Sequence, residues 1–121
     1  MPRLRTTILA ACVAVSMISV TDAKSGYLSG SDLLDSCKPQ TVDPVYRLKV
    51  AECRGYVIGV ADTFDCSREV VGVRWNNQAS VSQEDLVTTV IRWLNAHPRQ
   101  LQNQADGLIT AALSEAFPCG Q

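Results

Sequence analysis

Cysteine is the residue type in this chain with the widest range of possible chemistry, because a thiol can act as a nucleophile, bind a metal or form a disulfide. The sequence contains five cysteines and a single histidine, His97. A nucleophilic thiolate needs a neighbouring base and a zinc site needs several converging ligands, and both require thiols that stay reduced. In an exported protein the thiols oxidise instead. Four cysteines follow the N-terminal segment, and this even number predicts two disulfides made by Cys37, Cys53, Cys66 and Cys119.

The first 23 residues have the features of a cleaved export signal. After a basic start, residues 8–20 are uncharged and largely apolar, and the small residues Thr21 and Ala23 suit a signal peptidase. We therefore expect a signal peptide at 1–23 and one mature domain at 24–121, with no membrane contact after cleavage.

Two other interpretations of the N-terminal segment fit its residues less well. A retained membrane anchor would need roughly 20 apolar residues, and this run has about 13. Residues 9–12, Leu-Ala-Ala-Cys, resemble the lipidation box of bacterial lipoproteins, but most of the apolar run follows Cys12 when it should precede it.

The charges and motifs of the chain point away from nucleic acid and from catalysis. The formal net charge is −1, and the basic residues are scattered singly, without the clustered patch that phosphate binding requires. The sequence has no phosphate loop, dinucleotide fingerprint or serine hydrolase elbow. We therefore expect no cofactor, no metal, no catalytic residue and no nucleic acid partner, in a protein that is not an enzyme.

Apolar periodicity predicts an all-α fold, a small bundle of four to five helices. Apolar residues recur at spacings of three and four over about 29–37, 44–64, 82–96 and 98–117. Ser29 and Ser82 are each followed three residues later by aspartate, the pattern that begins a helix with a capping box. Asp43-Pro44 predicts the start of the second helix, since aspartate caps well and proline tolerates the first helical position. Pro98 ends the third helix, because the residue before a proline is pushed out of helical geometry.

Disulfides are expected to stabilise this bundle, whose core is small. Four cysteines can pair in three ways, and the sequence does not choose among them. We favour Cys37 with Cys53 and Cys66 with Cys119. The two loops so closed, of roughly 17 and 54 residues, correspond to about 3 and 4 kcal/mol in the chain-entropy model.

Two features outside the helix pattern are candidates for binding. Gly55 and Gly59 leave a smooth groove on the second helix, for which we expect close internal packing in preference to a ligand site. Residues 65–81 form the longest connection, and loops of this length in compact domains are often functional. Its residues of interface type are Arg74, Trp75, Asn76 and Asn77. The alternative for Trp75 is that it folds back over the core.

Four segments of the mature chain carry a resemblance to a known family. They read Leu-Leu-Asp-Ser-Cys at 33–37, Cys-Arg-Gly-Tyr-Val-Ile-Gly-Val-Ala-Asp at 53–62, Leu-Asn-Ala-His-Pro at 94–98 and Ala-Ala-Leu-Ser-Glu-Ala-Phe-Pro-Cys at 111–119. In this order they resemble the successive signatures of the Rap/Tai immunity family, which are small periplasmic helical proteins. Within these segments we expect structural roles for Gly55, Tyr56, Gly59, Asp62, Pro98 and Pro118. Similar sequences carry a Cys-x-Pro before the third helix where this chain has residues 76–78, and Cys66 is the candidate to make that bridge instead.

The resemblance implies inhibition. Proteins of this kind bind the peptidoglycan amidase effector of a type VI secretion system in the periplasm and cover its active site, often as homodimers. We expect the contacts to come from the connection at 65–81. Two alternatives are a periplasmic acid-stress chaperone, which would bind many clients at low pH, and an exported helical module of unknown partner.

Overall fold

The computed structural model describes residues 27–70, 72–77 and 80–120, and the signal peptide expected at 1–23 lies outside them. The helices are α1 (Gly30–Cys37), α2 (Tyr46–Ala61), α3 (Gln83–Ala96), a 3-10 turn η1 (Pro98–Gln100) and α4 (Ala105–Ala116). The described residues form no strand, and two single β-bridges join Ser29 to Gln104 and Val70 to Val73. The prediction of an all-α bundle with two disulfides is confirmed. Among the helices described, none combines the length and the apolarity needed to cross a bilayer.

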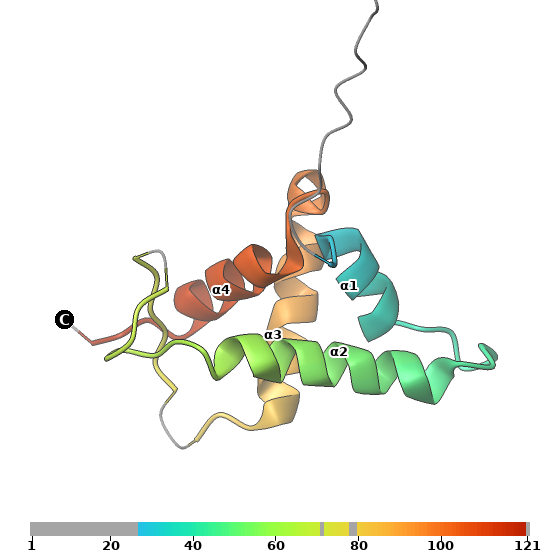
Figure 1. Ribbon diagram of the computed structural model, residues 1–121, viewed down its shortest axis with the longest axis horizontal. Coiled ribbons are helices and arrows are strands. Elements are labelled where there is room, and N and C mark those ends of the chain that lie inside the picture. The colour runs from blue at the N-terminus through green and yellow to red at the C-terminus, as the bar shows by residue number, and fades with distance from the viewer. Residues whose placement is uncertain (1–26, 71, 78–79, 121) are drawn as a thin grey trace, which may run out of the picture.

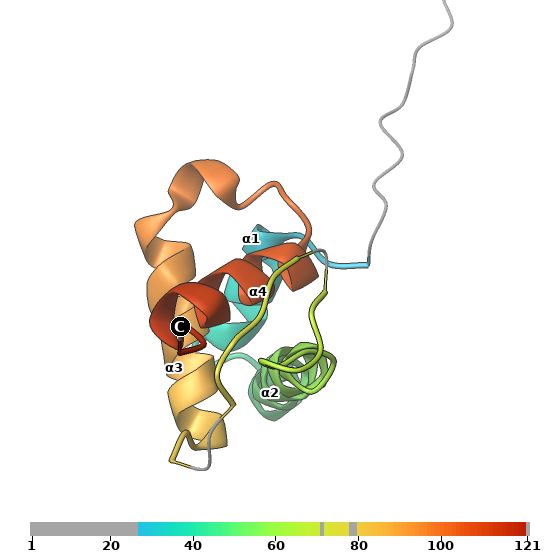
Figure 2. The ribbon, with the colours of Figure 1, turned by 90° about the vertical axis from the view of Figure 1, so that its left-hand side faces the viewer.

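The long helix α2 lies along one side of the bundle, and the other three helices pack against the same side of it (Figure 1). Figure 2 shows α2 nearly end-on, with α3 and α4 beside it. The core lies between these helices and includes residues from the connection between α2 and α3. Its buried apolar side chains are Leu33, Cys53, Val57, Ala61, Phe64, Trp75, Leu86, Val90, Leu94, Ala105, Leu108, Ile109, Ala112 and Leu113.

The predicted starts of α1 and α3 are confirmed. Ser29 and Ser82 are the N-caps, and each forms a capping box with the aspartate three residues later, Asp32 or Asp85. The Ser82 hydroxyl and backbone amide donate to the Asp85 carboxylate and lower its pKa. Each box satisfies backbone amides that lack a partner in the first helical turn.

The predicted start of α2 is wrong by two residues. The helix begins at Tyr46, after the N-cap Val45, which has no side chain able to cap. Asp43 forms a turn before the helix, where its Oδ1 accepts from the Val45 amide at 3.0 Å and its carbonyl accepts from the Tyr46 amide at 3.0 Å. The Val45 amide, followed by the Lys49 ammonium, lowers the pKa of this carboxylate. Asp43 therefore shapes the entrance to α2 without being its cap.

The first two turns of α2 extend past the core. The apolar spacing over 44–64 predicts one buried stripe along this helix that includes Val50, but 40% of Val50 is exposed, and Leu48 is 67% exposed. From Cys53 onward the stripe is buried as predicted. The disulfide between Cys37 and Cys53, with Cα atoms 5.0 Å apart, joins the end of α1 to the point where α2 enters the core.

The single last helix predicted over 98–117 is divided in the structure. After η1 the chain is irregular, and α4 begins at Ala105. The break places the N-terminus of α4 beside the N-terminus of α1, where the Ala105 amide donates to the Leu28 carbonyl at 3.0 Å. Figure 1 shows this crossing at the top of the bundle.

Hydrogen bonds to α1 account for the break. The amides of Gly30 and Ser31 have no partner within α1, because they belong to its first turn. They donate to the carbonyls of Asn103 and Leu101, each at 2.9 Å. In a continuous helix those carbonyls would accept bonds from the helix itself. Periodicity along one segment cannot reveal such a long-range exchange.

Gly30 is where the backbones of α1 and the break come closest, and replacing it by alanine is expected to destabilise the protein by about 1–3 kcal/mol. An added Cβ would lie 3.1 Å from the Cα and the carbonyl oxygen of Leu101 and closer still to the Leu108 side chain. Urea denaturation measures the change. Gly107→Ala is the matched control, since no atom in the described part of the chain lies within 4 Å of a Cβ there. Equal stabilities of the two variants would show that the approach is not tight.

Candidate functional site

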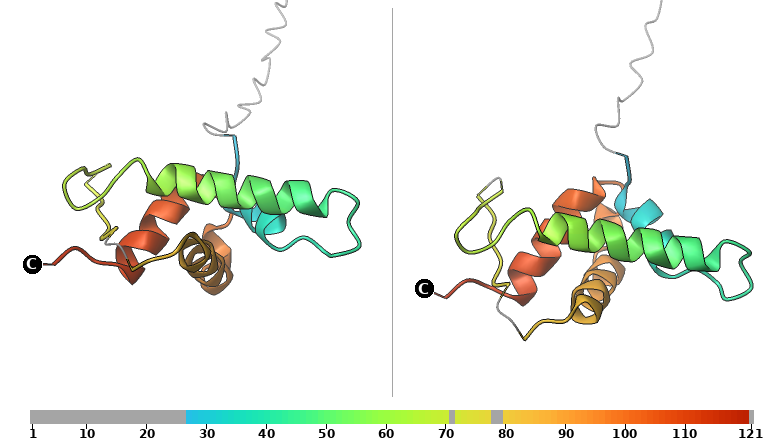
Figure 3. Two further views of the ribbon diagram at one scale, coloured as in Figure 1. Left: turned by 90° about the horizontal axis from the view of Figure 1, so that it is seen from below. Right: turned by 60° about the horizontal axis from the view of Figure 1, so that its bottom comes forward.

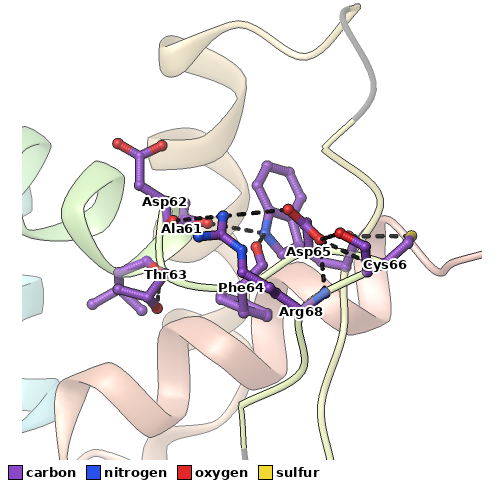
Figure 4. Close-up of polar contacts among 10 residues, drawn as sticks. Ala61, Asp62, Thr63, Phe64, Asp65, Cys66 and Arg68 are labelled. Atoms are coloured by element: carbon purple, nitrogen blue, oxygen red, sulfur yellow. Dashed lines mark hydrogen bonds and ion pairs between the residues drawn. The ribbon is translucent and has the colours of Figure 1, made fainter.

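The connection between α2 and α3 is the candidate site, and its first part is a turn built on Asp65 (Figure 4). One carboxylate oxygen, Oδ1, accepts from the Ser67 amide at 2.7 Å, the Ser67 hydroxyl at 2.6 Å and the Arg68 amide at 2.8 Å. The Arg68 guanidinium donates to the Asp62 carbonyl at 3.2 Å and to Asp65 Oδ2 at 3.3 Å. The turn therefore ties the connection to the end of α2.

Trp75 anchors the second part of the connection. Its side chain is only 5% exposed, and its Nε1 donates to the carbonyls of Phe64 at 2.6 Å and Ala61 at 3.1 Å. The indole also contacts the rings of Phe64 and Phe117, with centroids 6.2 and 6.1 Å away. The expectation that Trp75 contacts a partner is corrected by its burial, and the alternative, a ring folded over the core, describes its position.

A disulfide and a backbone bond tie the same segment to the C-terminal tail. Cys66 is bonded to Cys119, with Cα atoms 5.7 Å apart, which matches the favoured pairing. The Asn76 amide donates to the Phe117 carbonyl at 2.7 Å. We call residues 65–77 the stapled loop, since the disulfide, the Trp75 anchor and the Asp65 turn all hold it. Residue 71 of this loop is outside the described residues.

The tip of the stapled loop is a tight turn. Val70 and Val73 exchange backbone hydrogen bonds of 3.0 and 2.9 Å, and Gly72 between them has a φ of 76°. That left-handed conformation favours glycine over residues with a Cβ.

The predicted contact residues divide into exposed and inward-facing groups. Arg74 and Asn77 are exposed, Asn76 is half-buried and Trp75 is buried. Glu69 and Gly72 at the tip are exposed as well. The loop lies beyond the C-terminal end of α2, beside the C-terminal tail (Figure 1). It therefore presents polar and charged side chains from one end of the bundle on a fixed backbone.

The expected packing against Gly55 and Gly59 is wrong. Both residues are exposed, and a Cβ added to either would meet no atom of the described residues within 4 Å. A groove of about 370 Å³ lies beside them instead. It is lined by Gly55, Tyr56, Gly59, Val60, Thr63, Val70, Asp106 and Thr110, so it borders the stapled loop at Val70.

Tyr56 and Asp106 give this groove its polar edge. Partial burial of the tyrosine raises its pKa above the ordinary value, and the negative charge of Asp106 adds to the effect. The groove therefore has a phenol hydroxyl and a carboxylate along this edge. The other residues expected to be structural lie at the ends of elements: Asp62 caps α2, Pro98 begins η1, and Pro118 leads from Phe117 to the disulfide at Cys119.

The charge of Asp65 is expected to stabilise the stapled loop, and the effect should vanish in acid. The Ser67 hydroxyl and amide, followed by the Arg68 amide and guanidinium, lower the pKa of Asp65 to about 2. Because the folded pKa lies below the unfolded one, the stabilisation is complete above pH 4 and is lost as the pH falls towards 2. Asp65→Asn should therefore be less stable than the wild type at pH 7, with a gap that closes between pH 4 and pH 2.

Carboxyl NMR titration checks the cause directly. The Asp65 midpoint should lie near pH 2 and should rise towards 4 in Ser67→Ala, which removes the hydroxyl donor. A wild-type midpoint near 4 would contradict this description of the turn.

Within the described residues, no group of three or more His, Cys, Asp or Glu side chains could hold a metal.

Comparison with known proteins identifies the family of this chain. No curated protein matches the chain. Residues 29–119 match the Rap1a immunity proteins, a range that includes all four helices and both disulfides. With its bundle, its disulfides and its signatures covered from Ser29 to Cys119, the chain belongs to the Rap1a immunity protein family.

Proposed function

We propose that this protein is a periplasmic immunity protein that inhibits a peptidoglycan amidase effector of a type VI secretion system. The observation that carries the proposal is the stapled loop, which is fixed at several points and yet exposes Arg74 and Asn77. Membership of an immunity family supports a secreted effector as the partner. The two disulfides fit an oxidising compartment such as the periplasm.

A loop held in this way suits inhibition, because an inhibitor needs complementarity more than it needs reactive groups. Ordering a free loop on binding costs entropy, and a loop already fixed avoids that cost. Trp75 and the bond between Cys66 and Cys119 supply the fixation, while the exposed side chains supply the contacts. In this proposal Trp75 positions the contact residues and does not touch the effector.

The direct test is to search the neighbouring reading frames for the cognate amidase, to titrate that enzyme with the mature, oxidised protein and to follow hydrolysis of a cross-bridged muropeptide. We expect activity to fall to zero at a stoichiometric ratio at neutral pH. Full activity in the presence of excess protein would contradict the proposal. Binding of many unrelated clients at acid pH, with none to the amidase, would favour the chaperone alternative.

Within this proposal, Arg74→Ala is expected to weaken binding of the effector about tenfold, as is typical for an arginine at an interface. Isothermal titration calorimetry measures the change. Arg99→Ala is the matched control, because Arg99 is also exposed but lies on η1. If both variants bind like the wild type, the stapled loop does not supply this contact.

A homodimer, which the Rap/Tai resemblance implies, is also part of the proposal.

A further inference from the structure

The two disulfides differ in how far a thiol in solution can reach their sulfur atoms. Cys53 is 2% exposed, and its partner Cys37 is half-buried and packs against the core. Cys66 is exposed, and its partner Cys119 is half-buried. Both cysteines of this second pair lie outside the helices. Figure 3 shows the segments that hold them, the stapled loop and the C-terminal tail, at the end of the bundle opposite the connection between α1 and α2.

This difference in exposure sets which bond a thiol opens first in the folded protein. A thiolate must reach one sulfur of a disulfide in order to displace the other, so the rate depends on access. The Cys66 sulfur can be reached while the bundle stays folded. Attack at Cys53 requires α1 and α2 to separate, because the bond joins these two helices. Attack at Cys37 would release a thiolate at the buried Cys53, where burial disfavours the charge.

We propose that the bond between Cys66 and Cys119 is a site of reversible thiol–disulfide exchange with a dithiol, while the bond between Cys37 and Cys53 stays closed. A thiolate of the dithiol attacks the Cys66 sulfur, and Cys119 leaves as a thiolate. The second thiolate of the dithiol then attacks the first sulfur of the dithiol, which releases Cys66 as a thiolate. Two electrons pass to the protein, both cysteines take up the protons that the dithiol loses, and the dithiol becomes a disulfide.

Contacts around Trp75 keep the two opened segments near each other. The indole is buried against the ring of Phe117, and the Asn76 amide donates to the Phe117 carbonyl at 2.7 Å. The Cys66 sulfur lies 3.4 Å from the Trp75 carbonyl oxygen, so the reduced thiol has an acceptor in place (Figure 4). Thiols held in one neighbourhood have a high effective concentration for each other, which makes the exchange reversible.

Opening this bond loosens the stapled loop and leaves the bundle closed. The buried core and the bond between Cys37 and Cys53 still hold α1 and α2 together. The loop loses its covalent link to the C-terminal tail and keeps the Trp75 anchor and the Asp65 turn. A looser loop pays more entropy when it is ordered by a partner. The reduced form should therefore bind the effector more weakly, a consequence that rests on the proposed function.

Limited reduction of the mature, oxidised protein tests which bond opens. The folded protein is treated with dithiothreitol at neutral pH, and the free thiols are alkylated and located by peptide mass spectrometry. We expect label on Cys66 and Cys119 to appear at least tenfold faster than on Cys37 and Cys53. In urea that unfolds the chain, the two pairs should react at similar rates, because the fold causes the difference. Equal rates in the folded protein, or a difference that persists in urea, would overturn the proposal.

Two double variants are matched controls, since each retains one bond. Cys37→Ser with Cys53→Ser retains the exposed bond, and this bond should open at the wild-type rate. Cys66→Ser with Cys119→Ser retains the buried bond, which should open at least tenfold more slowly. Circular dichroism must show the wild-type helix content in both. If either variant fails to fold, the labelling of the wild type decides alone.

Hydrogen exchange and binding measure the consequence for the loop. With only the exposed bond reduced, the Asn76 amide should exchange at least tenfold faster, while the amide of Val90 within α3 keeps its protection. The amidase should bind this form at least tenfold more weakly, and reoxidation should restore the affinity. Unchanged exchange at Asn76, or equal affinities, would overturn the loosening of the loop. Oxidised protein that does not inhibit the amidase would instead overturn the proposed function, and the labelling would still decide the exchange site.

Discussion

Replacing Trp75 by alanine is expected to lower the free energy of unfolding by about 3–5 kcal/mol, the usual cost of truncating a buried large aromatic side chain. Trp75 is 5% exposed and lies between the rings of Phe64 and Phe117. Its removal would leave a cavity between the end of α2 and the C-terminal tail. It would also remove the donor shared by the carbonyls of Ala61 and Phe64.

Urea denaturation of three variants separates these contributions. Trp75→Phe keeps most of the packing and loses the N–H, so it should cost about 1–3 kcal/mol. Trp93→Ala is the control, because this half-buried indole donates to the exposed Glu115 carboxylate at 2.8 Å, and its loss should cost less than the loss of Trp75. A cost for Trp75→Ala no larger than that for Trp93→Ala would contradict the role of Trp75 as an anchor.

Removing the disulfide between Cys66 and Cys119 is expected to lower the free energy of unfolding by about 4 kcal/mol, and removing the one between Cys37 and Cys53 by about 3 kcal/mol. The difference arises because the first bond spans 53 residues and the second spans 16, so the first restricts the unfolded chain more. In each case both cysteines are replaced by serine. This avoids leaving a free thiol that could exchange with the other disulfide.

Thermal and urea unfolding of the two double variants check this order. Reducing the wild type should lower its stability below that of either variant, since both constraints are then lost. A larger loss from the short bond than from the long one would show that the contacts in the folded state outweigh the entropy of the unfolded chain.

Local sequence signals predicted the parts of the fold that local interactions determine. The capping boxes at Ser29 and Ser82 and the stop at Pro98 are confirmed, because each depends on residues within one turn. The favoured pairing of the cysteines, one of three that the sequence leaves open, agrees with the structure. The resemblance to an immunity protein family was also confirmed.

Contacts between distant segments explain the errors. The last helix is divided because carbonyls of its first part bond to the start of α1, and Gly30 gives no local sign of that approach. The periodicity of α2 correctly predicts a stripe, but it cannot show that Val50 lies past the edge of the core.

The sequence indicates the connection between α2 and α3 as a candidate site, and this assignment stays a prediction. Loop length identified the connection, whereas residue type alone placed Trp75 among the contacts. The turn on Asp65 was missed, although an aspartate followed two residues later by serine, Ser67, is a recognisable signal for it. The open space at Gly55 could not be foreseen, because a glycine in a helix is equally consistent with close packing and with an uncovered face.

The central claim is that this protein acts through the stapled loop, whose shape the disulfide between Cys66 and Cys119 maintains. A comparison of binding affinities tests this claim most directly. The affinity of the amidase should be measured for the wild type, for the variant lacking Cys66 and Cys119, and for the variant lacking Cys37 and Cys53, each under conditions where circular dichroism shows it folded. We expect the first variant to bind at least tenfold more weakly than the wild type and the second to bind like the wild type. Equal affinities for all three proteins would contradict the claim.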